Sequence, residues 1–326
     1  MTDAGPMPML PARPTDGHKG TFGTALVLGG AANATVMLGA PCLAGRAALR
    51  AGAGRVVLAV PAPLAVPAIG LLPEATGLPL PVDRDGTPLA AAWAEALDAA
   101  GEPACMVVGP GLAGAGLTGA ASAERDALEQ VLVRLIARDE PVLVLDAGAL
   151  TVISETPGGW DELRAPAILT PHPGEFRRIA TAVGVPEDPG SSADERVAAS
   201  EALARRLGTI VVLKGSGTVV SDGIRTAINN SGGSQLATGG TGDVLAGLIG
   251  GLVAAHFRPA PIPAMRRPDD LDLFDLARIA VHVHGRAADA WASAHGGRPL
   301  AAGMLAGELA DEIPRAMAAV RTPGAS

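Results

Sequence analysis

The stretch Thr238-Gly239-Gly240-Thr241-Gly242-Asp243, followed by the apolar run Val244-Leu245-Ala246-Gly247-Leu248-Ile249, decides the fold of this chain. Glycines supply backbone freedom and unobstructed N–H groups rather than side chains to bury. The apolar run predicts a helix that enters a packed core, and a helix N-terminus preceded by bare amides favours anions. Asp243 falls in the first turn of this helix, where it either caps the helix or does chemistry beside a bound anion.

The composition restricts the class of protein. The chain has 326 residues, a formal charge of −8, no Tyr, three Trp and four Phe, so its core must be aliphatic. A pI near 5.3 argues against nucleic acid as a partner, because neutralising phosphates requires a basic face. With only two cysteines, the chain has no disulfide framework and no C-x-x-C site. No signal pattern or membrane-span-length apolar run occurs, so we expect a cytoplasmic protein without a membrane partner.

Apolar runs typical of strands alternate with helix-like segments and glycine turns. Strands are expected at 25–28, 55–60, 105–108, 142–145, 168–170 and 209–213. Helices are expected at 35–53, 120–138, 193–207, after the glycine turn, at 271–294, and up to about 320. Asp222-Gly223 predicts a hairpin between 218–221 and 224–228. This order predicts an α/β fold with a mostly parallel central sheet.

The chain shows no linker or internal repeat after its first residues. Residues 1–17 are Pro-rich and aperiodic, which predicts a flexible N-terminal arm, either disordered or bound to a neighbouring subunit. Residues 18–326 are expected to form a single domain. Most of the predicted strands end in Gly, Asp, His or Lys, and ligands of open α/β sheets bind at that edge.

Lysine is nearly absent from this sequence. Only Lys19 and Lys214 occur, so both are candidates for positions where the broad guanidinium of arginine would not serve. Lys214 begins the run Lys214-Gly215-Ser216-Gly217-Thr218, which together with the Gly240–Asp243 turn resembles a nucleotide site of the ribokinase-like kind. In such a site the glycine turn holds the phosphate during transfer, and the aspartate takes the proton of the acceptor hydroxyl.

A competing motif follows the predicted strand 105–108. Gly109-Pro110-Gly111-Leu112-Ala113-Gly114 matches G-x-G-x-x-G, which would suggest a nicotinamide dinucleotide dehydrogenase. The match does not follow the first strand, Pro110 is awkward in a phosphate-binding turn, and the acids about 20 residues on fall inside a helix. We therefore expect no Rossmann-type cofactor site here.

One histidine is expected to contact a ligand, and none is expected to bind a metal. His172 lies between Pro171 and Pro173 at a strand end, where a rigid turn suits a ligand contact, and Glu175 is expected to cap the next helix. His282 and His284 lie two apart in a predicted helix, on different faces, so they are not a metal pair. No P-loop sequence is present.

With these residues assembled, the chain resembles the NAD(P)H-hydrate dehydratase family, whose members repair hydrated nicotinamide cofactors. The resemblance runs from about residue 18 to 250 in these stretches: His18-Lys19-Gly20 with Gly23, Gly39-Ala40, Ala48–Gly54, Gly109–Leu112, Leu145–Ala147, Leu169–Glu175, Val212–Gly215 and Ala237–Leu245. It implies a ribokinase-like three-layer α/β/α sandwich. It also implies conversion of (S)-NADHX or (S)-NADPHX to NADH or NADPH, with ADP or ATP as co-substrate, Mg²⁺, and a homo-oligomer of up to four subunits.

The resemblance also implies roles for individual residues. Asp243 would be the catalytic base and would contact the hydrated cofactor together with Ala40, Gly111 and His172. The adenine nucleotide would be bound by Lys214, Gly215, Ser216, Gly217 and Thr218, and by the turn Gly240, Thr241 and Gly242. No protein ligands to a metal are implied.

The sequence departs from the family at three places. Ala113 stands where members often have glycine. Asp146-Ala147-Gly148 stands where members often have Asp-Ala-Asp, which puts a role for the second carboxylate in doubt. Residues 230–235 differ from the usual Thr-Gly-Asn-Pro run. Two other functions stay open at this point. A ribokinase-like kinase of a small alcohol, such as a hydroxyethylthiazole, would share the glycine turn, and a nucleotide sensor would bind without turnover.

Overall fold

The computed structural model describes residues 2–33, 35–112, 122–258, 270–297 and 302–321. Within them, one sheet has the strand order β1-β12-β11-β10-β9-β8-β7-β2-β5-β6. In chain order its strands are β1 (Thr2–Asp3), β2 (Thr24–Leu28), β5 (Arg55–Pro61), β6 (Thr76–Leu80), β7 (Cys105–Val108), β8 (Val142–Leu145), β9 (Ala167–Leu169), β10 (Ile210–Leu213), β11 (Val219–Ser221) and β12 (Arg225–Ile228). A separate small hairpin joins β3 (Ala31–Ala32) to β4 (Val36–Met37).

All neighbouring strands from β10 to β6 run parallel, and β11 pairs antiparallel with both β10 and β12. The expected mostly parallel sheet and the hairpin at Asp222-Gly223 are therefore confirmed. Because Leu28 is in register with both Ala59 and Val108, the carboxyl ends of adjacent strands lie level at one edge. That edge is where ligands of open α/β sheets bind.

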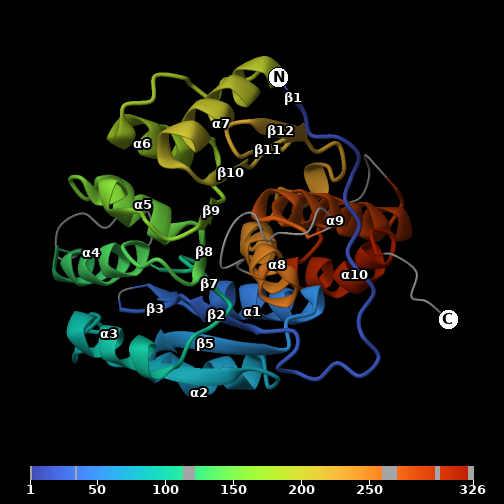
Figure 1. Ribbon diagram of the computed structural model, residues 1–326. Helices are drawn as coiled ribbons and strands as arrows, with labels where there is room; N and C mark the ends of the chain where they lie inside the picture. Colours follow the sequence, from blue (N-terminus) through green and yellow to red (C-terminus); the bar gives the residue numbers. More distant parts are fainter. Residues whose placement is uncertain (1, 34, 113–121, 259–269, 298–301, 322–326) are drawn as a thin grey trace.

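Helices cover both faces of the sheet (Figure 1). One core includes side chains of α1 (Gly39–Ala51), α2 (Ala62–Leu71), α8 (Thr241–His256), α9 (Leu273–Ala294) and α10 (Ala306–Ala318). The other includes side chains of α3 (Ala90–Ala99), α4 (Ser122–Ile136), α5 (Gly148–Glu155), α6 (Pro173–Val183) and α7 (Ala193–Leu207). The arrangement is a three-layer α/β/α sandwich, as predicted. No helix of the described residues is long and apolar enough to cross a membrane.

Helix α8, which follows the glycine turn, packs closely on α1. A Cβ on Gly247 would lie 2.0 Å from the carbonyl oxygen of Ala44, and one on Gly251 would lie 2.5 Å from that of Ala48. Glycine is therefore required at both positions for this approach. The small residues of α1 are thus used for packing inside the chain.

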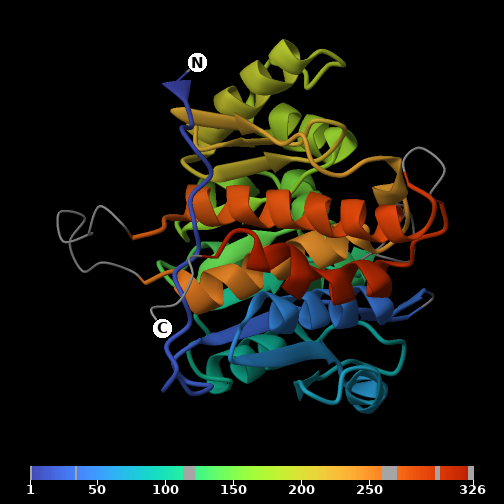
Figure 2. The ribbon, with the colours of Figure 1, turned by 90° about the vertical axis from the view of Figure 1, so that its right-hand side faces the viewer.

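The N-terminal segment differs from the predicted flexible arm. Thr2–Asp3 pairs with β12, Leu10 is fully buried, and the Leu10 amide donates to the Val320 carbonyl at 2.7 Å. Arg278 donates to the carbonyls of Ala4 and Gly5. Figure 2 shows this segment running past the start of α9 toward the helices below it. Proline removes backbone donors but leaves carbonyls, and arginine side chains from the body of the protein satisfy them.

Several predicted boundaries also differ. The expected helix 35–53 is split into the hairpin strand β4 and helix α1, which ends at Gly52 in a left-handed conformation. The expected capping role of Glu175 is confirmed by its capping box with His172, and Ser192 caps α7 in the same way. Elements α2, α3, β6 and α5 were not predicted, and α6 was expected only as the helix that Glu175 caps.

Candidate functional site

A buried ion pair joins two strand ends at the carboxyl edge of the sheet. Lys214 follows β10, and its Nζ lies 2.8 Å from Oδ1 of Asp146, which follows β8 and is 2% exposed. The same Nζ lies 3.8 Å from Oε2 of Glu175 on α6. Thr170, after β9, donates its hydroxyl to Oδ1 of Asp146 at 2.8 Å. Three neighbouring strand ends thus contribute to one charged cluster.

This cluster changes the interpretation of Lys214. The sequence suggested an ammonium available for phosphate, whereas the structure engages it with protein carboxylates. Burial lowers the pKa of Lys214, but Asp146 and Glu175 outweigh burial, so the pKa is raised and the ammonium stays charged. Its Nζ also lies 3.6 Å from the Cβ position of Gly242, so its charge still faces the glycine turn.

Asp243 lies in the first turn of α8 but does not cap it. The N-cap is Gly240, and no side chain makes a capping hydrogen bond there. Within the described residues, no donor hydrogen-bonds the Asp243 carboxylate. Burial and the neighbouring charge of Asp146 raise the pKa of Asp243 to about 7, although Lys214 lowers it. An unpartnered carboxyl with a pKa near neutrality suits proton transfer better than capping.

Contacts with α1 and hydrogen bonds to neighbouring groups fix the conformation of the glycine turn. Gly240 has a φ of 92°, and a Cβ there would lie 2.7 Å from Cδ1 of Leu43 on α1, so only glycine fits. The Thr241 hydroxyl donates to the carbonyls of Leu236 and Thr238. Nε2 of the buried His284 lies 2.9 Å from the Thr241 carbonyl oxygen. Burial is the main cause that lowers the pKa of His284 to about 4, so the neutral ring donates this bond.

A cavity of about 760 Å³ opens beside the turn. Of the predicted nucleotide residues it is lined by Lys214, Gly215, Ser216, Gly217, Thr218, Thr241 and Gly242. Gly240 is absent from this lining and supports the turn instead. Sequence reasoning missed the rest of the wall, which comes from 229–234, Leu236, Ala237, Leu245, Val281, His284 and Gly285. The polar run after β12 was the available signal for this wall.

The residues expected to contact the hydrated cofactor lie at the same edge of the sheet. Gly111 has a φ of 71°, and its Cβ position lies 3.3 Å from the Cβ of Ala40 and 3.2 Å from that of Met37. Ala40 lies on α1 one turn before Leu43, which contacts Gly240. Ala40 and Gly111 therefore connect to the glycine turn through α1.

His172 is the N-cap of α6, and its imidazole is half exposed. Its Nδ1 accepts from the amides of Gly174 and Glu175, while a Glu175 carboxylate oxygen accepts from the His172 amide at 2.8 Å. This confirms the expected capping role of Glu175. Nε2 of His172 lies 3.4 Å from the second Glu175 oxygen, and Glu175 in turn contacts Lys214. His172 thus borders the charged cluster.

The departure at Gly148 has a steric reason. A Cβ at this position would lie 1.9 Å from the carbonyl oxygen of Leu112. The preceding Ala147 has a φ of 46°, an uncommon conformation for a residue with a side chain. A second aspartate would not fit at 148 in this backbone.

The G-x-G-x-x-G match is used structurally in the residues that can be described, and Gly114 lies outside them. A Cβ on Gly109 would lie 1.7 Å from the Asp146 carbonyl oxygen, so glycine here allows the ends of β7 and β8 to meet. The Pro110 carbonyl accepts from the Gly30 amide at 2.9 Å. Both contacts belong to the sheet edge rather than to a pyrophosphate turn.

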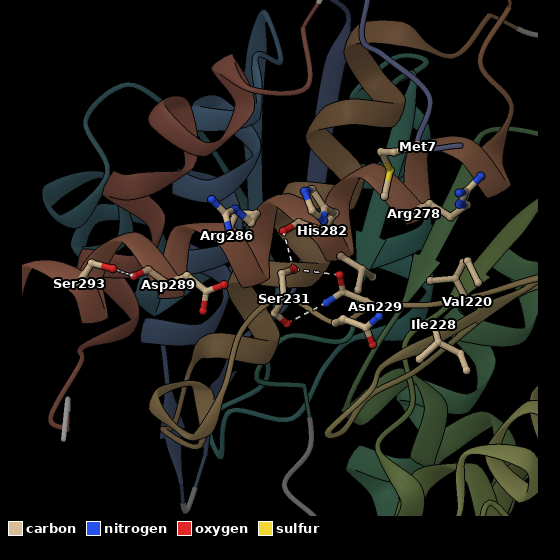
Figure 3. Close-up of a pocket in the computed structure, with 13 residues that line it drawn as sticks. Met7, Val220, Ile228, Asn229, Ser231, Arg278, His282, Arg286, Asp289 and Ser293 are labelled. Atoms are coloured by element: carbon tan, nitrogen blue, oxygen red, sulfur yellow. Dashed lines mark hydrogen bonds between the residues drawn. The ribbon is translucent and has the colours of Figure 1, made fainter. Parts of the chain in front are cut away.

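A second cavity, of about 720 Å³, lies between α9 and the β11–β12 hairpin (Figure 3). It shares Asn229, Asn230, Ser231 and Val281 with the first cavity, so the segment 229–231 is part of a wall between the two. The Ser231 hydroxyl donates to Asn229 Oδ1 and to the His282 carbonyl, as Figure 3 shows. His282 lines this second cavity, whereas His284 lines the first.

Comparison with known proteins identifies a family. A family model described as NAD(P)H-hydrate dehydratase matches residues 25–315. The ADP-dependent (S)-NAD(P)H-hydrate dehydratase of Bacillus subtilis is 36% identical over 313 residues, which is 94% of this chain and 93% of the relative. The bifunctional NAD(P)H-hydrate repair enzyme Nnr of Salinibacter ruber is 37% identical over 97% of this chain. This chain spans about half the length of that bifunctional relative, 52% of it.

Solved structures agree with this grouping. A crystal structure of the ADP/ATP-dependent NAD(P)H-hydrate dehydratase of Bacillus subtilis, co-crystallised with ATP/Mg²⁺, matches with a TM-score of 0.71 at 32% identity, covering 96% of this chain and 95% of that one. A ribokinase-like superfamily protein of Enterococcus faecalis matches with a TM-score of 0.71 at 22% identity, covering 97% and 93%. The second match supports the ribokinase-like fold alone.

Proposed function

The chain belongs to the NAD(P)H-hydrate dehydratase family, and from this premise we propose that it converts (S)-NADHX or (S)-NADPHX to NADH or NADPH with ADP or ATP as the phosphoryl donor. The observation that carries the proposal is the Asp243 carboxyl. It has no hydrogen-bond donor within the described residues, and its pKa is raised to about 7 beside a cavity lined by glycine turns. A base with a pKa near the working pH is the most effective one.

The proposed chemistry has two steps. The hydrate carries a hydroxyl on the reduced nicotinamide ring, and hydroxide is a poor leaving group. Asp243 takes the hydroxyl proton while the hydroxyl oxygen bonds to the terminal phosphorus of the donor, whose bridging P–O bond breaks. The ring nitrogen lone pair then expels phosphate, and loss of a proton from the adjacent ring carbon restores the double bond. The products are the reduced cofactor, phosphate, and AMP or ADP.

The rest of the site binds and orients, as is general for phosphoryl transfer. The amides of Gly240–Gly242 would hold the moving phosphoryl group at the N-terminus of α8, where the helix dipole favours negative charge. Lys214 would offset charge on the donor from its position 3.6 Å from the Gly242 Cβ site. Ala40, Gly111 and His172 would contact the hydrated cofactor.

Mg²⁺ is proposed to arrive with the nucleotide. Within the described part of the chain, no three His, Cys, Asp or Glu side chains gather as a metal site, and Asp146 is engaged by Lys214. Mg²⁺ in nucleotide enzymes is held largely by substrate phosphates and water. The Bacillus subtilis relative was co-crystallised with ATP/Mg²⁺.

Phosphate release distinguishes the proposed activity from the two alternatives. We expect inorganic phosphate to appear only when NADHX or NADPHX is supplied together with ADP or ATP. A small-alcohol kinase would instead form a stable phosphate ester from its own acceptor. A nucleotide sensor would bind nucleotide and release nothing. Phosphate assays with each donor and substrate pair, and with plain NAD and NADP as controls, therefore test the proposal.

We also propose a cytoplasmic homo-oligomer, at least a dimer and up to a tetramer. The N-terminal segment and α1 pack within their own chain, so they give no support to an oligomer. The proposal is supported by large apolar side chains that remain exposed, among them Val36, Val66 and Leu305. Light scattering at micromolar concentration should give a mass of at least twice 32.4 kDa. A monomeric mass would refute this assembly.

A further inference from the structure

Arg196, on α7, is a buried cation in an unusual environment. It is 7% exposed, and its Nη2 donates to the carbonyls of Leu213 at 3.0 Å and Lys214 at 3.3 Å. Its Nε has no hydrogen-bond partner, and among the described residues no carboxylate forms an ion pair with it. Burial lowers the pKa of Arg196, but a guanidinium stays protonated in proteins. Buried charges are ordinarily paired, whereas this one has no counter-ion in the part of the chain that the structure describes.

The guanidinium lies directly beneath the turn that follows β10. A Cβ on Gly215, whose φ is 149°, would lie 2.9 Å from Nη2 of Arg196, so glycine is needed for the two to meet. Arg196 donates hydrogen bonds to the carbonyls of Leu213 and Lys214. The Thr218 hydroxyl donates to the carbonyl of Gly215 at 2.9 Å. Protein donors thus occupy the carbonyls of Leu213, Lys214 and Gly215, at the start of the turn.

The backbone N–H groups of the same turn remain available to a ligand. Within the described residues, the amides of Gly215, Ser216 and Gly217 have no hydrogen-bond acceptor, and all three residues line the 760 Å³ cavity. Successive unpaired amides around glycines of positive φ form an anion-binding concavity. A positive charge behind such a concavity strengthens its field. The arrangement is that of an anion site with a fixed cation at its base.

We propose that Arg196 is a positioning residue for the phosphates of the nucleotide. It holds the carbonyls of Leu213 and Lys214 so that the amides of 215–217 are available to the cavity, and the phosphates supply the counter-charge that Arg196 lacks. The proposal rests on the proposed function only in placing a nucleotide in this cavity. Arg196 itself does not line the cavity and touches no reacting atom.

The test measures binding of adenosine, AMP, ADP and ATP by calorimetry without any hydrated cofactor, so a failed turnover assay does not affect it. Arg196→Met keeps an unbranched side chain in place of the aliphatic stem and removes the charged guanidinium. We expect ATP and ADP to bind at least tenfold more weakly to this variant and adenosine to bind as to the wild type. Arg196→Lys keeps the charge and should retain most of the difference between ATP and adenosine.

Arg205→Met is the matched control. Arg205 also lies on α7 and also donates to a backbone carbonyl, that of Gly223, but at the hairpin rather than at the cavity. We expect this variant to lose stability without a change in nucleotide affinity. If Arg196→Met does not fold, Arg196→Gln, which keeps a donor for the carbonyls, replaces it. Equal losses for adenosine and ATP, or an unchanged ATP affinity, would overturn the proposal.

Discussion

Asp243→Asn should slow turnover strongly while leaving the protein folded and able to bind nucleotide. We expect kcat to fall by roughly 10²–10⁴, the usual contribution of a positioned base. ADP and ATP should bind as tightly as before or more tightly, because a carboxylate beside the phosphates has been replaced by a neutral amide. Single-turnover phosphate release, measured beside nucleotide calorimetry, tests both expectations together.

The melting temperature of the same variant, compared with that of wild type, tests the raised pKa of Asp243 separately. The pKa of Asp243 is raised to about 7 in the folded protein, so the folded state holds this proton more tightly than the unfolded chain does. The contribution of Asp243 to the free energy of unfolding is therefore present below the unfolded pKa near 4 and is lost as the pH rises toward 7. Asp243→Asn should melt at least as high as wild type at pH 8.

Asp275 supplies the matched control for Asp243. It occupies the third position of α9, the same place in its helix, but it serves a capping box with Asp272. Asp275→Asn should change stability and leave turnover within a few-fold of wild type. If Asp243→Asn behaves in the same way, Asp243 is structural and the proposed base is wrong.

Lys214→Met should have the second-largest effect, on stability and on rate. It removes the partner of Asp146, whose carboxylate is 2% exposed. Breaking a buried pair costs about 3–5 kcal/mol, and the lysine side chain is 20% exposed, so we expect a loss near 3 kcal/mol in the free energy of unfolding. Nucleotide affinity should also fall, since the ammonium faces the glycine turn.

The pH profile should report Lys214 as well. Lys214 lowers the pKa of Asp243, so its removal should move the midpoint of the rising limb of kcat to a higher pH. The rate lost at neutral pH should then be partly recovered in alkaline buffer. The double variant with Asp146→Asn should regain much of the stability, because Asp146, the carboxylate closest to the lysine, is then neutral. A pH midpoint that stays in place would remove Lys214 from the electrostatics of Asp243.

The edge of the sheet could be predicted because local sequence encodes it. Short apolar runs that end in Gly109, Asp146, His172 and Lys214 are strands, and parallel strands bring their carboxyl ends together. The turn before α8 could be predicted for the same reason, since consecutive glycines before an apolar run have few alternatives. The five predicted residues after β10 do line one cavity, together with Thr241 and Gly242.

The features that were not predicted depend on contacts between residues that are distant in sequence. The ion pair of Lys214 joins residues 68 positions apart, and no local pattern shows that its charge is already engaged. Gly148 excludes a side chain only because Leu112 lies above it. Residues 1–17 have the composition of a tail, yet Ala4 is hydrogen-bonded to Arg278 and Leu10 to Val320, both distant in sequence. Tertiary structure, not propensity, decides each case.

The central claim is that phosphorylation of the ring hydroxyl and loss of phosphate are coupled at this site. The most direct measurement supplies (S)-NADHX and ADP to the wild-type protein and follows NADH by its absorbance and inorganic phosphate in the same reaction. We predict that NADH and inorganic phosphate appear at equal rates and in a one-to-one ratio, with AMP as the other product. Phosphate release without NADH, or a phosphorylated product that accumulates, would contradict it.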